Sequence, residues 1–122
     1  MTSIHSFTGQ SGTVYQFNVA PTGFHHGDVA GIYILLAGSL MMFDPKVLYV
    51  GKTASALDRP GGFADGHHVQ AAANTLGFSH IGFLAAAYEL QRDNIEQDLI
   101  AGLNPPLNVQ HRTNAFTGLG RY

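Results

Sequence analysis

Residues 30–36, AGIYILL, and residues 47–53, VLYVGKT, are two short apolar runs that decide the fold of this chain. Both are rich in isoleucine, valine, leucine and tyrosine, and such runs are typical of β-strands. Turn-forming residues lie between them, at Ala37-Gly38-Ser39 and at Asp44-Pro45-Lys46. We therefore predict that the chain reverses between the two runs and that they pair as a hairpin.

Further elements are predicted on both sides of this hairpin. Residues 4–8 and 13–19 read as another hairpin, expected to flank the central sheet. Residues 66–76 carry apolar side chains at i, i+3, i+4 and i+7, which indicates a helix between an Asp65 cap and Gly77. A capping-box pattern at Ser55-x-x-Asp58 predicts a short helix before that, which Pro60-Gly61-Gly62 would stop.

The second half of the chain continues this alternation of elements. The near-continuous apolar run at 78–88 favours a strand covered on both faces, although its alanines also suit a helix. Residues 92–103 read as a helix that ends at Asn104-Pro105-Pro106, because the residue before a proline disfavours the α region. We expect a single α+β domain over 1–122. It would comprise an N-terminal hairpin and loop (1–29), a core (30–108) and an irregular tail (109–122).

Composition narrows the possible functions. The 122 residues are 45% hydrophobic and 11% charged, as expected for a compact globule. The absence of cysteine excludes disulfides and a thiol nucleophile, and the seven histidines match no zinc spacing. No apolar run approaches the roughly 20 residues of a membrane span, and no signal sequence is evident, so we expect a cytoplasmic protein with no membrane partner. The net charge of −2 argues against a broad basic surface for nucleic acid.

Glu96 is the least expected residue of the last predicted helix. Ile95, Leu99, Ile100 and Leu103 define the apolar stripe of this helix, and Glu96 lies on or beside it. A carboxylate in that position needs a cation, which is either a metal ion or Arg92 one turn earlier. The simpler interpretation is an Arg92–Glu96 pair within the helix, worth a few tenths of a kcal/mol.

Tyr33 and Tyr49 also allow two interpretations. Tyrosine is a good strand residue, so both rings can simply fill a core. A phenol titrates near pH 10 and can act as a base at neutral pH only beside a cation or metal-bound water. Lys52 and Arg59 supply cations three and ten residues after Tyr49, and an arginine fork suits phosphate oxygens. Arg59 can equally be a solvated helix residue.

Taken together, these residues resemble the GIY-YIG nuclease superfamily, whose name spells the motifs Gly31-Ile32-Tyr33 and Tyr49-Val50-Gly51. Arg59 stands where the family carries its helix arginine, and Lys52 follows the glycine as in the cutting domain of the bacterial excision nuclease. Glu96 matches the metal-binding glutamate and Asn108 the closing asparagine. The resemblance covers about residues 30–108.

The resemblance implies a small three-stranded antiparallel sheet packed with helices, and hydrolysis of DNA phosphodiester bonds by an activated water. Tyr49, assisted by Lys52 and Tyr33, would help to deprotonate that water, while Arg59 steadies the phosphate. Glu96 would hold Mg²⁺ or Mn²⁺, which needs few protein ligands when phosphate and water supply the others. Asn108 would anchor the site.

The chain departs from the family pattern in a long connection between Tyr33 and Tyr49, in Pro60 directly after Arg59, and in Phe63 where many members carry histidine. The alternative function is an inactive module that keeps the fold and binds nucleic acid or protein. A third hypothesis is that the apolar Met41-Met42-Phe43 segment forms a homodimer contact on which activity depends.

Overall fold

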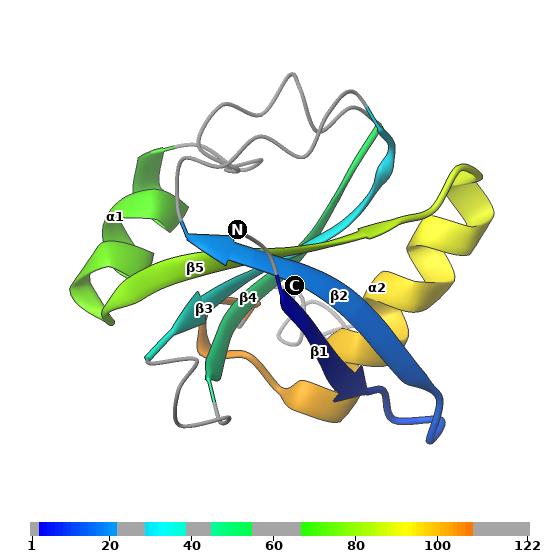
Figure 1. Cartoon of the computed structure of the whole chain (residues 1–122), viewed down its shortest axis with the longest axis horizontal. Coiled ribbons are helices and arrows are strands. Elements are labelled where there is room, and N and C mark those ends of the chain that lie inside the picture. Colours follow the sequence, from blue (N-terminus) through cyan, green and yellow to red (C-terminus); the bar gives the residue numbers. More distant parts are fainter. Residues whose placement is uncertain (1–2, 22–28, 39–44, 55–66, 109–122) are drawn as a thin grey trace, which may run out of the picture.

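The structure is a computed structural model that describes residues 3–21, 29–38, 45–54 and 67–108. Within these ranges the protein is α+β, with strands and helices arranged as in Figure 1. The strands are β1 (Ser3–Thr8), β2 (Val14–Pro21), β3 (Gly31–Ala37), β4 (Lys46–Thr53) and β5 (Phe78–Ala85). The helices are α1 (His67–Thr75), α2 (Glu89–Leu103) and the short 3-10 turn η4 (Pro106–Asn108).

All described strands join one antiparallel sheet in the order β1-β2-β5-β3-β4. The sheet therefore has five strands instead of the three implied by the resemblance. The difference arises because the N-terminal hairpin does not merely flank the sheet. Its second strand pairs with β5, from Asn18 opposite Phe83 to Pro21 opposite His80. This pairing gives β5 a hydrogen-bonded neighbour on each side.

The predicted elements within the described ranges are confirmed in type and differ at their ends. Both hairpins form, and 78–85 is a strand, whereas 86–88 lie outside it. Helix α2 starts at Glu89, three residues earlier than predicted. It ends as expected before the prolines, with Asn104 in the left-handed region at φ 52° and ψ 55°. The short helix predicted after residue 54 lies outside the described residues.

The sheet separates two apolar clusters, with α1 and α2 on either side of the strands (Figure 1). Strand alternation explains the division, because successive side chains point to opposite faces. Ile32, Ile34 and Val50 face α2, where they pack with Leu99 and Ile100. The opposite cluster contains both motif tyrosines and Ala73 of α1. A bulge where Leu36 follows Leu35 shifts the β3–β4 register.

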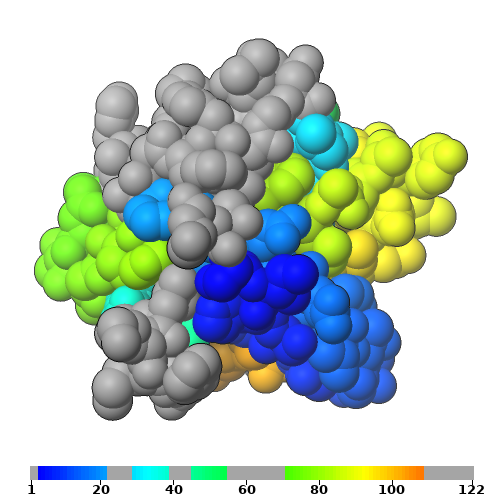
Figure 2. Space-filling view, viewed as in Figure 1, coloured from blue at the N-terminus to red at the C-terminus, as the bar shows by residue number. Residues whose placement is uncertain are grey.

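The turn of the N-terminal hairpin is bound to the second half of α2. Asp98 accepts hydrogen bonds from the Ser11 backbone (2.8 Å), the Ser11 hydroxyl (2.7 Å) and the Tyr15 hydroxyl (2.7 Å). Gly102 allows the close approach, because a Cβ there would lie 2.5 Å from the Gln10 nitrogen. The first half of α2, in yellow, projects at the edge of the molecule in Figure 2. None of the helices in the described ranges is long and apolar enough to cross a bilayer.

Candidate functional site

Tyr33 and Lys52 lie near one end of the sheet, whereas Tyr49 lies further along β4, opposite Leu35. At this end β3 begins while β4 and β5 finish, since Gly31 pairs with both Thr53 and Ala85. Helix α2 starts four residues after β5 and packs against β4 and β3. The fold thus brings parts of β3, β4 and α2 together although they are separated by tens of residues in the chain.

Tyr33 and Tyr49 lie together on the face opposite α2. Their ring centroids are 6.2 Å apart, with an interplanar angle of 36°, and the residues are 3% and 5% exposed. The end of the Tyr33 ring lies against Gly51, where a Cβ would stand 2.3 Å from the hydroxyl oxygen. The glycine of the second motif therefore makes room for the tyrosine of the first. Both tyrosines are core residues, and the Tyr33 hydroxyl reaches the backbone position just before Lys52.

Asn108 fixes the strand that carries Tyr49. Its side-chain oxygen accepts a hydrogen bond from the Val50 nitrogen at 2.9 Å, and its amide nitrogen donates to the Val50 oxygen at 3.0 Å. The residue is fully buried. Since β4 is an edge strand of the sheet, the amide supplies the hydrogen bonds that another strand would give. Asn108 therefore fixes the backbone at Val50, the residue between Tyr49 and Gly51. Its side chain is not exposed to solvent.

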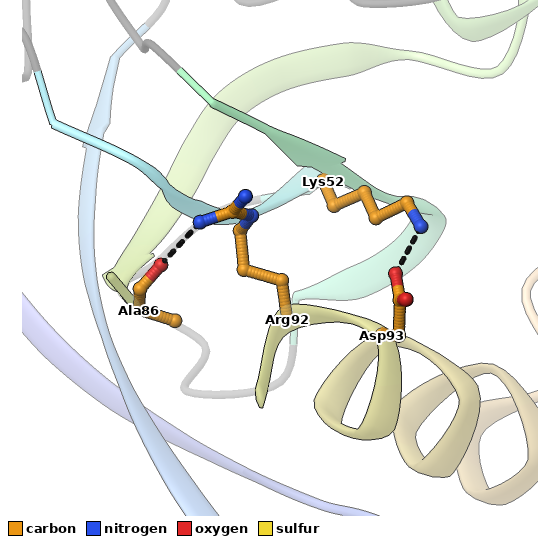
Figure 3. A network of polar contacts seen from close by, with 4 residues as sticks. All are labelled: Lys52, Ala86, Arg92 and Asp93. Carbon is orange, nitrogen blue, oxygen red and sulfur yellow. Dashed lines mark hydrogen bonds and ion pairs between the residues drawn. The ribbon is translucent and has the colours of Figure 1, made fainter. Parts of the chain in front are cut away.

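Glu96 is buried on α2, with a relative exposure of 9%, next to the apolar residues Leu99 and Ile100. This placement is the one that the helical pattern predicted. Arg92, which the simpler interpretation pairs with Glu96, donates hydrogen bonds to backbone carbonyl oxygens. Its Nη1 donates a hydrogen bond to the carbonyl oxygen of Ala86 at 3.1 Å (Figure 3) and another to that of Ala87 at 2.9 Å. These bonds attach the segment between β5 and α2 to the first turns of α2.

Lys52 forms an ion pair with Asp93 of α2 (Figure 3). The two side chains are 42% and 31% exposed. The pKa of Lys52 is raised, chiefly by the hydrogen bond to Asp93 and further by the charges of Glu96, Asp93 and Glu89, although partial burial opposes the shift. Lys52 is therefore held as a cation. Sequence reasoning missed Asp93, and the signal that could have found it is the spacing 89, 93, 96, which places three carboxylates on one side of the helix.

The sheet divides the candidate site into two groups. Lys52 reaches α2, on the same face as Ile32 and Val50, and its charge interacts with that of Glu96. Tyr33 and Tyr49 belong to the cluster on the other face. Tyr33 and Lys52 lie near the same end of the sheet, but the Lys52 ammonium binds Asp93 on the α2 face, whereas the tyrosine rings lie on the other face. Arg59, the remaining candidate, lies outside the described residues.

Among the candidate residues, the carboxylate of Glu96 is the side chain of a type that binds hard metal ions. Within residues 3–21, 29–38, 45–54 and 67–108, no three histidine or acidic side chains are grouped closely enough to hold a metal by themselves. Mg²⁺ and Mn²⁺ prefer oxygen ligands and commonly take one or two from protein carboxylates. The buried carboxylate of Glu96 fits that donor chemistry, whereas the carboxylate of Asp93, one turn away, is bound by Lys52.

A cavity of about 370 Å³ lies at the other end of α2. It is bordered by the beginning of β4, the end of α2 and strand β1. The described residues that line it are His5, Ser6, Phe7, Pro45, Lys46, Val47, Leu103, Asn104 and Pro106. Since no candidate residue is among them, this cavity is distinct from the candidate site.

Comparison of the chain with protein-family models, with curated proteins and with solved structures found no match.

Proposed function

We propose that this protein is a divalent-metal-dependent nuclease that hydrolyses phosphodiester bonds of DNA. The observation that carries the proposal is that Lys52 lies on the α2 face of the sheet within reach of the charge of the buried Glu96, although 44 residues separate them, while Tyr33 lies on the opposite face near the same end of the sheet. These residue types suit phosphate hydrolysis, which needs an oxygen ligand for a metal, a cation for the phosphate and a group that accepts a proton.

Each candidate residue has a separate role in this proposal. Glu96 would hold Mg²⁺ or Mn²⁺ through its carboxylate, and the ion would supply Lewis-acid chemistry when bound. Lys52 stabilises the negative charge that develops near it. Tyr49, as a phenolate, would take one proton from the attacking water and become a neutral phenol, with Tyr33 beside it. Arg59 steadies the phosphate, as the resemblance to the GIY-YIG superfamily implies, and Asn108 keeps β4 in place.

A second candidate is a non-catalytic module that binds nucleic acid or protein. The observation that favours it is the burial of both tyrosines, which are 3% and 5% exposed and which the core alone accounts for. The ion pair between Lys52 and Asp93 also fits a purely structural role. Nuclease assays distinguish the two candidates.

The test is cleavage of plasmid, duplex and single-stranded DNA with Mg²⁺ or Mn²⁺. Glu96→Gln, Tyr49→Phe and Arg59→Ala are each expected to lower the rate on the order of 10²-fold. Glu89→Gln is the matched control, because it removes a carboxylate from the exposed first turn of α2. Absence of cleavage by the parent on all substrates would favour the binding module. Cleavage by the parent that none of the three substitutions reduces would show that the assigned site is wrong.

A further inference from the structure

The ion pair between Lys52 and Asp93 joins two segments that are 41 residues apart in sequence. It is partly open to water, with side-chain exposures of 42% and 31%. Each charge is therefore accessible to another partner without unfolding of the surrounding elements. Salt bridges of this exposure are weak, and a competing ion of high charge density can replace one member.

The surroundings of Lys52 oppose the approach of an anion. Among the described residues whose charges act on its ammonium, Glu89, Asp93 and Glu96 are negative. Their spacing along α2 places them on one side of the helix. Of the three, Asp93 alone is hydrogen-bonded to Lys52. A phosphate that binds Lys52 therefore competes with the Asp93 carboxylate for the ammonium.

We propose that Asp93 is a positioning residue that binds Lys52 until substrate arrives, so that the DNA backbone has to compete with its carboxylate for the ammonium. The inference rests on the proposed function, because it assigns Lys52 to a substrate phosphate. The exchange swaps one anionic partner of Lys52 for another and breaks no covalent bond. Asp93 thus lowers the affinity for DNA and holds the Lys52 side chain beside Glu96 when the site is empty.

The test compares binding of a fluorescently labelled short DNA duplex at low salt with divalent ions removed by EDTA. Asp93→Asn is expected to tighten binding by about two- to fivefold, the range that corresponds to a partly exposed ion pair. Glu89→Gln is the matched control, since it removes one negative charge from the same side of α2 without breaking a hydrogen bond to Lys52. Its effect should stay below about twofold. Asp93→Ser is a second variant, and urea unfolding checks that each variant is folded.

The decisive comparison repeats Asp93→Asn and Glu89→Gln in a protein that also carries Lys52→Gln. Without the ammonium, Asp93→Asn should no longer tighten binding beyond the effect of Glu89→Gln. Persistence of the full gain in this background would overturn the inference, because it would show a general effect of charge. In cleavage assays Asp93→Asn should lower KM without raising kcat, whereas a merely structural role would not produce that split.

The outcomes also separate this inference from the proposed function. If the parent cleaves DNA but Asp93→Asn binds no more tightly than Glu89→Gln, the inference on Asp93 is wrong and the nuclease proposal stands. If neither the parent nor any variant binds DNA, with EDTA or with Ca²⁺ present, both are wrong.

Discussion

Asn108 hydrogen-bonds both backbone groups of Val50, although 58 residues separate the two in sequence. The Asn108 amide thereby takes the place of a neighbouring strand at Val50, the residue of edge strand β4 between Tyr49 and Gly51. The asparagine is fully buried, so its bonds to Val50 are shielded from bulk solvent. This relationship explains how the chain that leaves α2 determines the position of the second motif.

Asn108→Ala is expected to lower the free energy of unfolding by about 2–4 kcal/mol, since it leaves a buried donor and a buried acceptor without partners. Urea unfolding followed by circular dichroism measures the change. Asn94→Ala, at an exposed position of α2, is the control and should change stability by less than about 0.5 kcal/mol. A loss below about 1 kcal/mol for Asn108→Ala would mean that the amide does not support β4.

Gly51→Ala is expected to lower the free energy of unfolding by about 1–3 kcal/mol, because the added Cβ overlaps the end of the Tyr33 ring. In a Tyr33→Leu background the same substitution should cost clearly less. A double-mutant cycle in urea unfolding measures this coupling. Equal costs in both backgrounds would contradict the close packing of Tyr33 on Gly51.

Asp98→Asn is expected to change how stability depends on pH. Hydrogen bonds from Ser11, followed by the one from Tyr15, hold the pKa of the Asp98 carboxyl below its usual value. A depressed pKa in the folded state stabilises the protein above the unfolded-state pKa of about 4, and this contribution is lost as the pH falls through the folded-state pKa. The parent should therefore exceed Asp98→Asn by about 1 kcal/mol at pH 6, and by progressively less below pH 4.

Thermal or urea unfolding between pH 2.5 and 7 checks the Asp98 prediction. A difference between the two proteins that stays constant over this range would show that the charge of Asp98 does not matter. The hydrogen bond from the Tyr15 hydroxyl to Asp98 can also be tested at alkaline pH, through the titration of Tyr15. The pKa of Tyr15 is raised, mainly by burial and next by its bond to Asp98, so the substitution should lower it.

Arg92→Ala is expected to lower the free energy of unfolding by about 1 kcal/mol, because the carbonyl oxygens of Ala86 and Ala87 lose a charged donor. Arg92→Lys is the control, since it keeps the charge and shortens the reach. Hydrogen exchange at the start of α2 should speed up in Arg92→Ala. An unchanged exchange rate there would contradict the role of Arg92 in fixing the connection after β5.

The strands, the main helices and the burial of Glu96 could be predicted from sequence because each depends on local pattern. Alternating or continuous β-formers define β3 to β5, and the apolar stripe of α2 places Glu96 beside Leu99. The end of α2 follows from Asn104 before a proline. Its start was placed too late, because Tyr88 occupies the N-cap position without a side-chain capping bond and carries no capping signal.

The relationships that escaped prediction join distant segments. The pairing of β2 with β5 made the sheet larger than expected, since a strand pattern does not name its partner. The Lys52–Asp93 pair likewise depends on which face of β4 meets α2. Proximity in sequence placed Lys52 with Tyr49, whereas alternation along the strand sends the two side chains to opposite faces. The activity, the metal and the DNA substrate stay predictions.

The insertion of β5 between β2 and β3 has a consequence for any attempt to shorten the protein. A fragment that starts at residue 30 would retain the GIY-like and YVG motifs but would expose one edge of β5 and lose Phe17 and Val19 from the core around Leu99. Exposed strand edges attract other strands. Such a fragment is expected to self-associate, because β2 would no longer cover that edge of β5.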